Sequence, residues 1–234
     1  MKNQSLRVSI FHCALASLLL SAPLARAADS PPADPKDECN KVISDASAAY
    51  TSMQSKPETA IPNWVVQQAK GVIILVRWSG AVGIGGTAGS GIGLKKNADG
   101  AFSAPAFYSV GGASLGLQVG GGKTETVAFL MSDKALNTLT DSKFVWSGNV
   151  KAVAGDHSSQ SSTVNNTADV ILYQQSSGLD VGAVVAGTQV SVANEHNRKF
   201  YENATITPQE IFAGKVKTPD SAKNLTDALD KQAK

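Results

Sequence analysis

The sequence is poor in residues that build disulfides, metal sites and membrane spans. It has two cysteines, Cys13 and Cys39, and of its three histidines only His157 and His196 lie beyond the N-terminal segment. Those two histidines have no ligand-like spacing. The apolar run from Val8 to Leu20 has thirteen residues, whereas a membrane-spanning helix needs roughly 20. We therefore expect no disulfide within the folded chain, no metal and no cofactor.

The first 27 residues have the order of charged, apolar and small residues that is typical of a cleavable secretory signal. Lys2 and Arg7 precede the apolar run, and Ala25-Arg26-Ala27 suits a signal peptidase. Cys13 lacks the leucine-then-small-residue context of a bacterial lipoprotein signal. Residues 1–27 are therefore predicted to be a signal peptide, and the remaining chain is predicted to be periplasmic or secreted by a bacterium.

Excess charge of one sign is also missing outside the signal. Cleavage after Ala27 would remove Lys2, Arg7 and Arg26 from the 21 basic residues and leave 18 against 19 acidic residues. We expect no nucleic-acid partner for such a chain. Electrostatic attraction to an anionic membrane would require its cations to cluster.

The rest of the chain is predicted to form a flexible leader and one domain. Residues 28–36 are rich in Pro, Ala and Asp without periodicity, and residues 37–234 are long enough for a single β-rich domain with its core at about 61–214. From Asp37, apolar residues recur every three or four positions and predict a helix that packs on its own domain rather than on a membrane: Cys39, Val42, Ile43, Ala46, Ala49, Tyr50 and Met53.

Capping signals predict further helices. Pro62 opens a short helix, Ser132 can cap another, and the capping box Thr207-Pro-Gln-Glu210 precedes a helix that Gly214 can end. Pro219 opens a final helix with few apolar positions, which we expect to fray.

Strand patterns dominate the middle of the chain. Gly71–Val76 is a continuous β-branched run, and the segment after it places glycine at alternate positions, so one face would be nearly bare and another backbone could approach it closely. A membrane helix with small-xxx-small spacing is excluded, because Arg77 and Lys95 bracket too few residues and each interior glycine costs a helix about 1 kcal/mol. Further strands are expected at 102–108, 113–120, 124–131, 144–154, 170–175 and 181–192.

These elements predict an α+β fold. We expect a curved antiparallel β-sheet or barrel of about seven or eight strands, flanked by N- and C-terminal helices.

Two motifs of enzymes are present in contexts that argue against catalysis. Gly112-Ala-Ser114-Leu-Gly116 matches a nucleophile elbow, with Asp180 and His196 in hydrolase order, but Ser114 lies in an alternating strand with no helix after it. Gly83-Ile-Gly85-Gly-Thr-Ala88 resembles a dinucleotide fingerprint without a surrounding βαβ unit. We expect a non-enzymatic protein, with an esterase built on Ser114 as the alternative.

Several dispersed blocks resemble the SYLF domain family. They occur in the family's order across roughly Ile61 to Gly214: Ile61-Pro-Asn-Trp-Val-Val-Gln-Gln-Ala-Lys-Gly71, Ala101-Phe-Ser-Ala-Pro-Ala-Phe107, Gly111-Gly-Ala-Ser-Leu-Gly-Leu-Gln-Val-Gly120, Asn194-Glu-His-Asn-Arg-Lys-Phe-Tyr201 and Pro208-Gln-Glu-Ile-Phe212. Eukaryotic members are associated with phosphoinositides and with actin-patch and endocytic proteins. For an exported bacterial protein, the resemblance implies only a phospholipid-binding module. The family's Pro-Val-Gly-Arg-like turn and basic amphipathic helix have no clear counterpart here.

We therefore predict an exported protein that binds phospholipid or a membrane surface in the cell envelope. The alternative is a structural or protein-interaction module of the periplasm, with an envelope protein as partner and no lipid affinity. The candidate headgroup-binding residues are the cations at expected strand ends: Lys70, Lys95, Lys96, Arg77 and Lys123. With alternating strand directions, Arg77 lies at the opposite edge from Lys95 and Lys96, so that Lys70, Lys95 and Lys96 form the favoured cluster. The alternative is that each cation is a solvated strand end.

Overall fold

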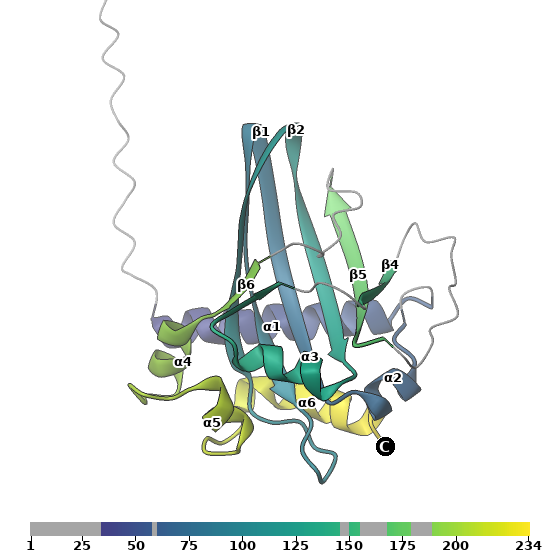
Figure 1. The fold of residues 1–234 in the computed structure, drawn as a ribbon, viewed down its shortest axis with the longest axis vertical. Helices are drawn as coiled ribbons and strands as arrows, with labels where there is room; N and C mark the ends of the chain where they lie inside the picture. Colours follow the sequence, from purple (N-terminus) through teal and green to yellow (C-terminus); the bar gives the residue numbers. More distant parts are fainter. Residues whose placement is uncertain (1–33, 58–59, 146–149, 155–167, 179–188) are drawn as a thin grey trace, which may run out of the picture. The chain divides into compact units, whose positions relative to one another are not determined.

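Two strands of 25 residues each, β1 (Gly71–Lys95) and β2 (Ala106–Leu130), form the centre of the fold (Figure 1). The computed structural model describes residues 34–57, 60–145, 150–154, 168–178 and 189–234. Four shorter strands complete a six-stranded sheet within these ranges: β3 (Lys143–Val145), β4 (Val150–Ala154), β5 (Val170–Gly178) and β6 (Gln189–Val192). The order is β3-β6-β2-β5-β4, and β1 pairs with β2. Only β4 and β5 pair in parallel among these strands.

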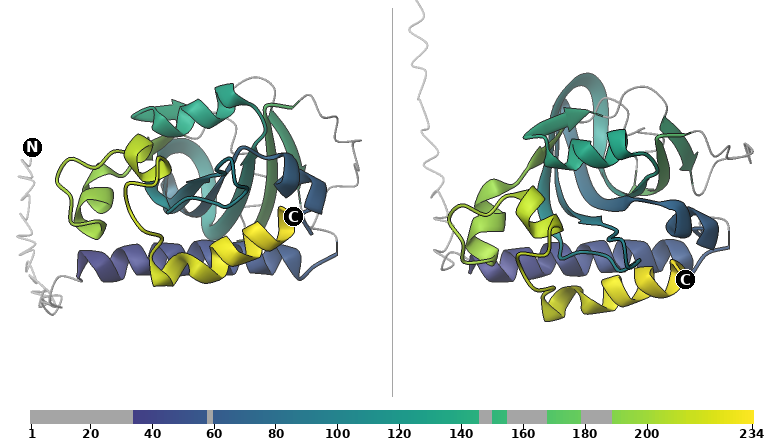
Figure 2. Two further views of the ribbon diagram at one scale, coloured as in Figure 1. Left: turned by 90° about the horizontal axis from the view of Figure 1, so that it is seen from below. Right: turned by 60° about the horizontal axis from the view of Figure 1, so that its bottom comes forward.

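Helices at both ends of the domain flank this sheet (Figure 2). The described helices are α1 (Pro35–Gln54), α2 (Asn63–Gln68), α3 (Asp133–Asn137), the 3-10 turn η1 (Thr138–Thr140), α4 (Asn194–Phe200), α5 (Pro208–Phe212) and α6 (Asp220–Gln232). The predicted α+β class, a curved and mainly antiparallel sheet between N- and C-terminal helices, is confirmed.

Strands predicted as separate elements are fused. The β-branched run and the glycine-rich segment are one strand, β1, and Ala106–Leu130 likewise joins segments expected as three strands. The strand end expected at Arg77 is therefore wrong, because Arg77 pairs with Thr124 inside the ladder and Gly80 pairs with Gly121. Glycines on both strands let the pair bend, because no Cβ atoms crowd the bend, and the register of the ladder shifts between Val82 and Ile84.

β1 folds back so that its returning half packs on its outgoing half, and the views from below show the strand pair as an arch (Figure 2). A Cβ atom on Gly91 would lie 2.0 Å from the carbonyl oxygen of Ile74, and one on Gly89 would lie 2.4 Å from that of Val76. The backbone N–H of Lys96 donates to the carbonyl of Lys70 at 2.9 Å and closes the base of the fold. The predicted close approach of a backbone to the bare glycine face is confirmed, and that backbone is the strand's own first half.

The two faces of the outgoing half of β1 are buried in different cores, which explains its continuous apolar sequence. Val72, Ile74 and Val76 pack in a core with the apolar stripe of α1 and with Leu225 and Leu229 of α6. Ile73 and Leu75 face a second core, built with residues of β2, β3, β5, β6 and α5. The predicted stripe of α1 is confirmed, with Val42 at its partly buried margin.

The ends of the domain differ from the sequence-based expectations at two places. α1 begins at Pro35, with the Asp34 side chain accepting from the Lys36 N–H, so the predicted leader 28–36 extends too far; its residues before 34 lie outside the described ranges. α6 does not fray, because Asp230 accepts from the Phe102 N–H at 2.8 Å and the Gln232 amide donates to the Ile61 carbonyl at 2.6 Å.

Three of the predicted capping positions are confirmed. Ser132 caps α3, the reciprocal capping box of Thr207 and Glu210 opens α5, and Gly214 follows α5 with a φ of 77°. The positive φ suits glycine at a helix end.

The close packing of β1 on itself predicts a position-specific response to added methyl groups. Gly91→Ala should lower the free energy of unfolding by about 1–3 kcal/mol or more, because the new Cβ would overlap the Ile74 carbonyl. Gly80→Ala is the matched control on the same strand, since nothing lies within 4 Å of a Cβ there. Urea denaturation measures both variants. Equal midpoints for Gly91→Ala and the parent would contradict the described packing.

Candidate functional site

The five predicted cations fall into two separate groups. Lys70, Lys95 and Lys96 meet at the base, where the two ends of β1 are joined by the Lys96-to-Lys70 backbone hydrogen bond. Arg77 and Lys123 lie further along the sheet, in the adjacent rows Arg77–Thr124 and Trp78–Lys123. Lys70 and Arg77 are seven residue steps apart along extended chain, or roughly 23 Å. The backbones of Lys70, Lys95 and Lys96 lie close together, as expected from the sequence. The role of these lysines in headgroup binding stays a prediction.

Two of the basal ammonium groups make contacts within the domain. Lys70 Nζ lies 2.6 Å from an Asp133 carboxylate oxygen. Lys96 Nζ donates to the Val66 carbonyl at 3.0 Å and to the Gln67 carbonyl at 2.5 Å. Both acceptors belong to the C-terminal end of α2, where helical carbonyls lack intrahelical partners, and burial lowers the pKa of Lys96. Lys96 therefore acts as a structural cap of α2.

Lys123 lies where the sheet extends past the helix that covers it, whereas Arg77 is buried in the neighbouring row, whose side chains point to the other face. Opposite residues on paired strands share a face, so Val76, Glu125 and Gln175 form one row, and the next row on that face is Trp78, Lys123 and Ser177. Ser52, in the last turn of α1, reaches the first of these rows through its hydrogen bond with Gln175. Trp78 in the second row is 58% exposed, and Lys123 Nζ lies 5.6 Å from the centroid of its ring.

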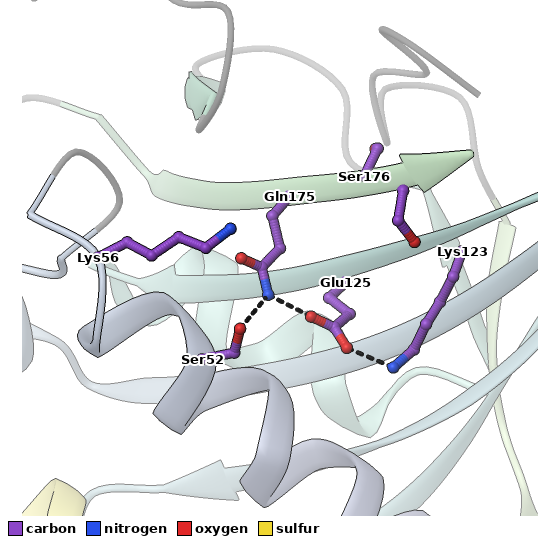
Figure 3. A pocket seen from close by; sticks show the side chains of 7 residues that line it. Ser52, Lys56, Lys123, Glu125, Gln175 and Ser176 are labelled. Atoms are coloured by element: carbon purple, nitrogen blue, oxygen red, sulfur yellow. Dashed lines mark hydrogen bonds and ion pairs between the residues drawn. The ribbon is translucent and has the colours of Figure 1, made fainter. Parts of the chain in front are cut away.

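A polar pocket of about 290 Å³ lies at this boundary (Figure 3). Residues from three distant segments line it: Ser52 of α1 with Lys56 just after the helix, Lys123 and Glu125 of β2, and Gln175, Ser176 and Ser177 of β5. Its volume lies at the lower end of the range for small-molecule sites. The pocket therefore fits a headgroup-sized ligand.

Glu125 fixes the orientation of the groups around it. One carboxylate oxygen lies 2.5 Å from Lys123 Nζ, and the other accepts a hydrogen bond from the Gln175 side-chain amide, which also donates to Ser52 Oγ at 3.0 Å. A carboxylate can only accept, so the NH₂ group of Gln175 must face it. The Gln175 carbonyl oxygen, Oε1, consequently turns toward the side on which Figure 3 shows the Lys56 ammonium. This oxygen is buried and has no hydrogen-bond donor among the described residues.

The enzyme-like motifs lie in ordinary strand and helix contexts. Ser114 pairs with Gly85 inside β2, which continues to Leu130, so no strand-to-helix turn follows the serine. The segment that resembles a dinucleotide fingerprint, Gly83–Ala88, is likewise part of β1. His196 lies on α4, its Nε2 3.8 Å from Glu38, and Asp180 lies outside the described residues. Within the described ranges, no group of three or more His, Cys, Asp or Glu could hold a metal ion.

Sequence reasoning missed most of the pocket. The sequence pattern could have indicated Glu125, because strand alternation places this residue on the same face as Val127 and Phe129. A charged residue is unusual on such an apolar face. Ser52, Lys56 and Gln175 had no comparable signal, since they meet only through the fold.

No helix in the described part of the chain has the length and apolar content needed to cross a membrane.

Residues 111–232 match the Ysc84 family, described as Las17-binding protein actin regulator. The chain is 31% identical over 182 residues to protein YSC84 of Saccharomyces cerevisiae, covering 75% of this chain and 39% of that protein. It is 28% identical over 187 residues to SH3 domain-containing YSC84-like protein 1 of Xenopus laevis, covering 77% and 56%. The chain thus spans about two fifths of the length of the Saccharomyces cerevisiae relative and somewhat over half of the length of the Xenopus laevis relative. No solved structure matches it.

The two adjacent basal lysines should respond differently to loss of charge. Lys96→Met should lower the free energy of unfolding by about 1–2 kcal/mol, because it leaves the α2 carbonyls without their donor. Lys95→Met should change it by less than about 0.5 kcal/mol, since the Lys95 side chain makes no ion pair with a described residue. Chemical denaturation distinguishes them. Equal effects would rule out the capping role.

Proposed function

Because this chain belongs to the Ysc84 family, the SYLF domain family that its sequence blocks resemble, we propose that it is a non-enzymatic protein that binds phospholipid surfaces in the bacterial envelope. The observation that carries the lipid-binding proposal is the pair formed by exposed Trp78 and by Lys123, which also lines the polar pocket.

This pair combines the two groups suited to a membrane interface. A tryptophan indole presents apolar area together with one N–H donor, and it prefers the boundary between headgroups and acyl chains. A lysine places its ammonium at the headgroup level while its stem covers apolar surface. Lys123 lies over the Trp78 ring, so docking this edge would bury the indole and bring the ammonium to lipid phosphates together.

Such binding would depend only partly on net charge. The chain without residues 1–27 is close to neutral, so attraction must come from a local site and from apolar burial. Burial of an indole contributes hydrophobic binding free energy that salt does not screen. The attraction between ammonium and phosphate, in contrast, weakens as ionic strength rises. We expect affinity to fall with salt but not to vanish.

A protein partner is the second candidate function, and the family description favours it. The matched family is described as Las17-binding, and a relative in Saccharomyces cerevisiae is named LAS seventeen-binding protein 3. Exposed tryptophan is also typical of protein interface anchors. In an envelope compartment, the partner would be another envelope protein.

Vesicle binding discriminates between these functions. The protein should co-sediment with vesicles, and Trp78→Ala should weaken this binding at least about five-fold, since most of an indole's burial is lost. Val145→Ala is the matched control, because Val145 is the other exposed large apolar residue of the described structure and lies on β3. Unchanged vesicle binding of Trp78→Ala would refute the proposal that the protein docks on membranes through Trp78 and Lys123. Absence of parent binding across lipid compositions would favour a protein partner.

Export is proposed from the N-terminal pattern and has its own test. The protein recovered from the envelope of an expressing bacterium should begin at Ala28 and carry no acyl chain, because Ala25-Arg26-Ala27 is the predicted cleavage site. Intact-mass measurement decides this. A mass that includes residues 1–27, or recovery only from the cytoplasm, would overturn the assignment.

A further inference from the structure

Each charged side chain that lines the polar pocket in the described structure already has a partner. Lys123 forms an ion pair with Glu125, and Lys56 also has an interaction partner. An anionic or a cationic ligand would therefore have to compete with an interaction that the protein already makes. The lining offers hydrogen bonding instead, which favours an uncharged ligand.

Two acceptors of the lining can take further donors. Gln175 is 8% exposed, and its Oε1 has no donor among the described residues, whereas its amide group donates to Glu125 and Ser52. The Glu125 carboxylate contacts Lys123 and Gln175, and a carboxylate offers about four acceptor sites. A complementary ligand therefore carries several hydrogen-bond donors.

Hydroxyl groups line the pocket from both of its sides. Ser52 of α1 accepts a hydrogen bond from Gln175 and keeps its own O–H as a donor, and exposed Ser177 of β5 lies across the pocket from the helix. A hydroxyl both donates and accepts, so other hydroxyls match it best. The ligand must present such groups in more than one direction.

An uncharged sugar ring meets these requirements. Its hydroxyls point outward around the rim of the ring, whereas a carboxamide presents its donors and its acceptor at one end. The pocket volume of about 290 Å³ lies at the lower end of the range for small-molecule sites. One ring therefore suits the pocket better than a long oligosaccharide.

We propose that the pocket between α1, β2 and β5 binds one uncharged pyranose unit. Ligand hydroxyls donate to Gln175 Oε1 and to the Glu125 carboxylate, and another exchanges a hydrogen bond with Ser177. The ring can belong to a free saccharide or to the headgroup of a glycolipid. The glycolipid form rests on the proposed membrane-binding function, whereas the free form does not.

Isothermal titration with soluble pyranosides tests the pocket without any membrane. The methyl pyranosides of glucose, galactose and mannose differ only in the orientation of their hydroxyls, and at least one should bind with a dissociation constant on the order of 1 mM or lower. The hydroxyl-free ring 2-methoxytetrahydropyran should bind at least ten-fold more weakly, because it brings no donor to the pocket. Absence of pyranoside binding, or equal affinity for the hydroxyl-free ring, would overturn the proposal.

Charged derivatives of the bound sugar test the inference from the paired charges. The 2-amino and 6-phosphate derivatives should bind no more tightly than the neutral methyl pyranoside, because no lining charge is available to pair with theirs. Tighter binding of either derivative would show that the pocket recognises charge, and it would overturn an uncharged ligand.

Variants then locate the site. Gln175→Met removes Oε1 and should weaken pyranoside binding at least about five-fold, and Ser177→Ala should weaken it at least about two-fold. Gln189→Met and Ser109→Ala are the matched controls, because both residues are exposed on the paired strands β6 and β2, and they should leave the affinity unchanged. Thermal unfolding verifies that the variants fold. Parental affinity of folded Gln175→Met would refute this placement, and Ser177→Ala decides if Gln175→Met does not fold.

Vesicles distinguish the source of the ring. Stronger co-sedimentation with phospholipid vesicles that contain a diacylglycerol glycoside of the bound sugar than with the same vesicles without it supports the glycolipid form. Pyranoside binding without vesicle binding supports the free form and removes the proposed membrane function. Trp78-dependent vesicle binding without pyranoside binding overturns the pocket alone.

Discussion

The architecture depends on contact between two backbones of the same strand. Gly89 and Gly91 let the returning half of β1 lie against the carbonyls of Val76 and Ile74, closer than any side chain would permit. This contact brings Lys96 beside Lys70 and closes the base, and β2 follows the same course because it pairs with β1 along its length. A long hairpin is thereby turned into a curved sheet that encloses a second core.

The position of the pocket follows from how far α1 covers this sheet. α1 is 20 residues long, about 30 Å, and its buried stripe ends at Met53. Beyond that point the same sheet face changes from apolar to polar, from Val127 and Tyr173 to Glu125 and Gln175, and then to exposed Trp78 and partly buried Lys123. The polar row thus marks the end of the core and provides hydrogen bonds where the helix no longer supplies apolar cover.

Local patterns predicted the elements well and their joining poorly. The α1 stripe and the caps at Ser132 and Thr207 depend on residues within a few positions, which a sequence displays directly. Strand continuity through Gly80 depends on Gly121, 41 positions later, and no local signal carries that pairing. The candidate site shows the same division between local and long-range information. The sequence indicated the lysines at strand ends. It could not indicate the capping role of Lys96, which depends on α2, or the pocket, which three distant segments form together.

Glu125 and Gln175 connect the site to the stability of the domain. Glu125 holds both Lys123 and Gln175, and Gln175 reaches Ser52 of α1, so one chain of hydrogen bonds joins the exposed Trp78–Lys123 edge to the helix. These residues come from segments that are far apart in the sequence, so this chain of hydrogen bonds forms only when α1 docks on the sheet. It thereby links the exposed edge to the packing of the first core.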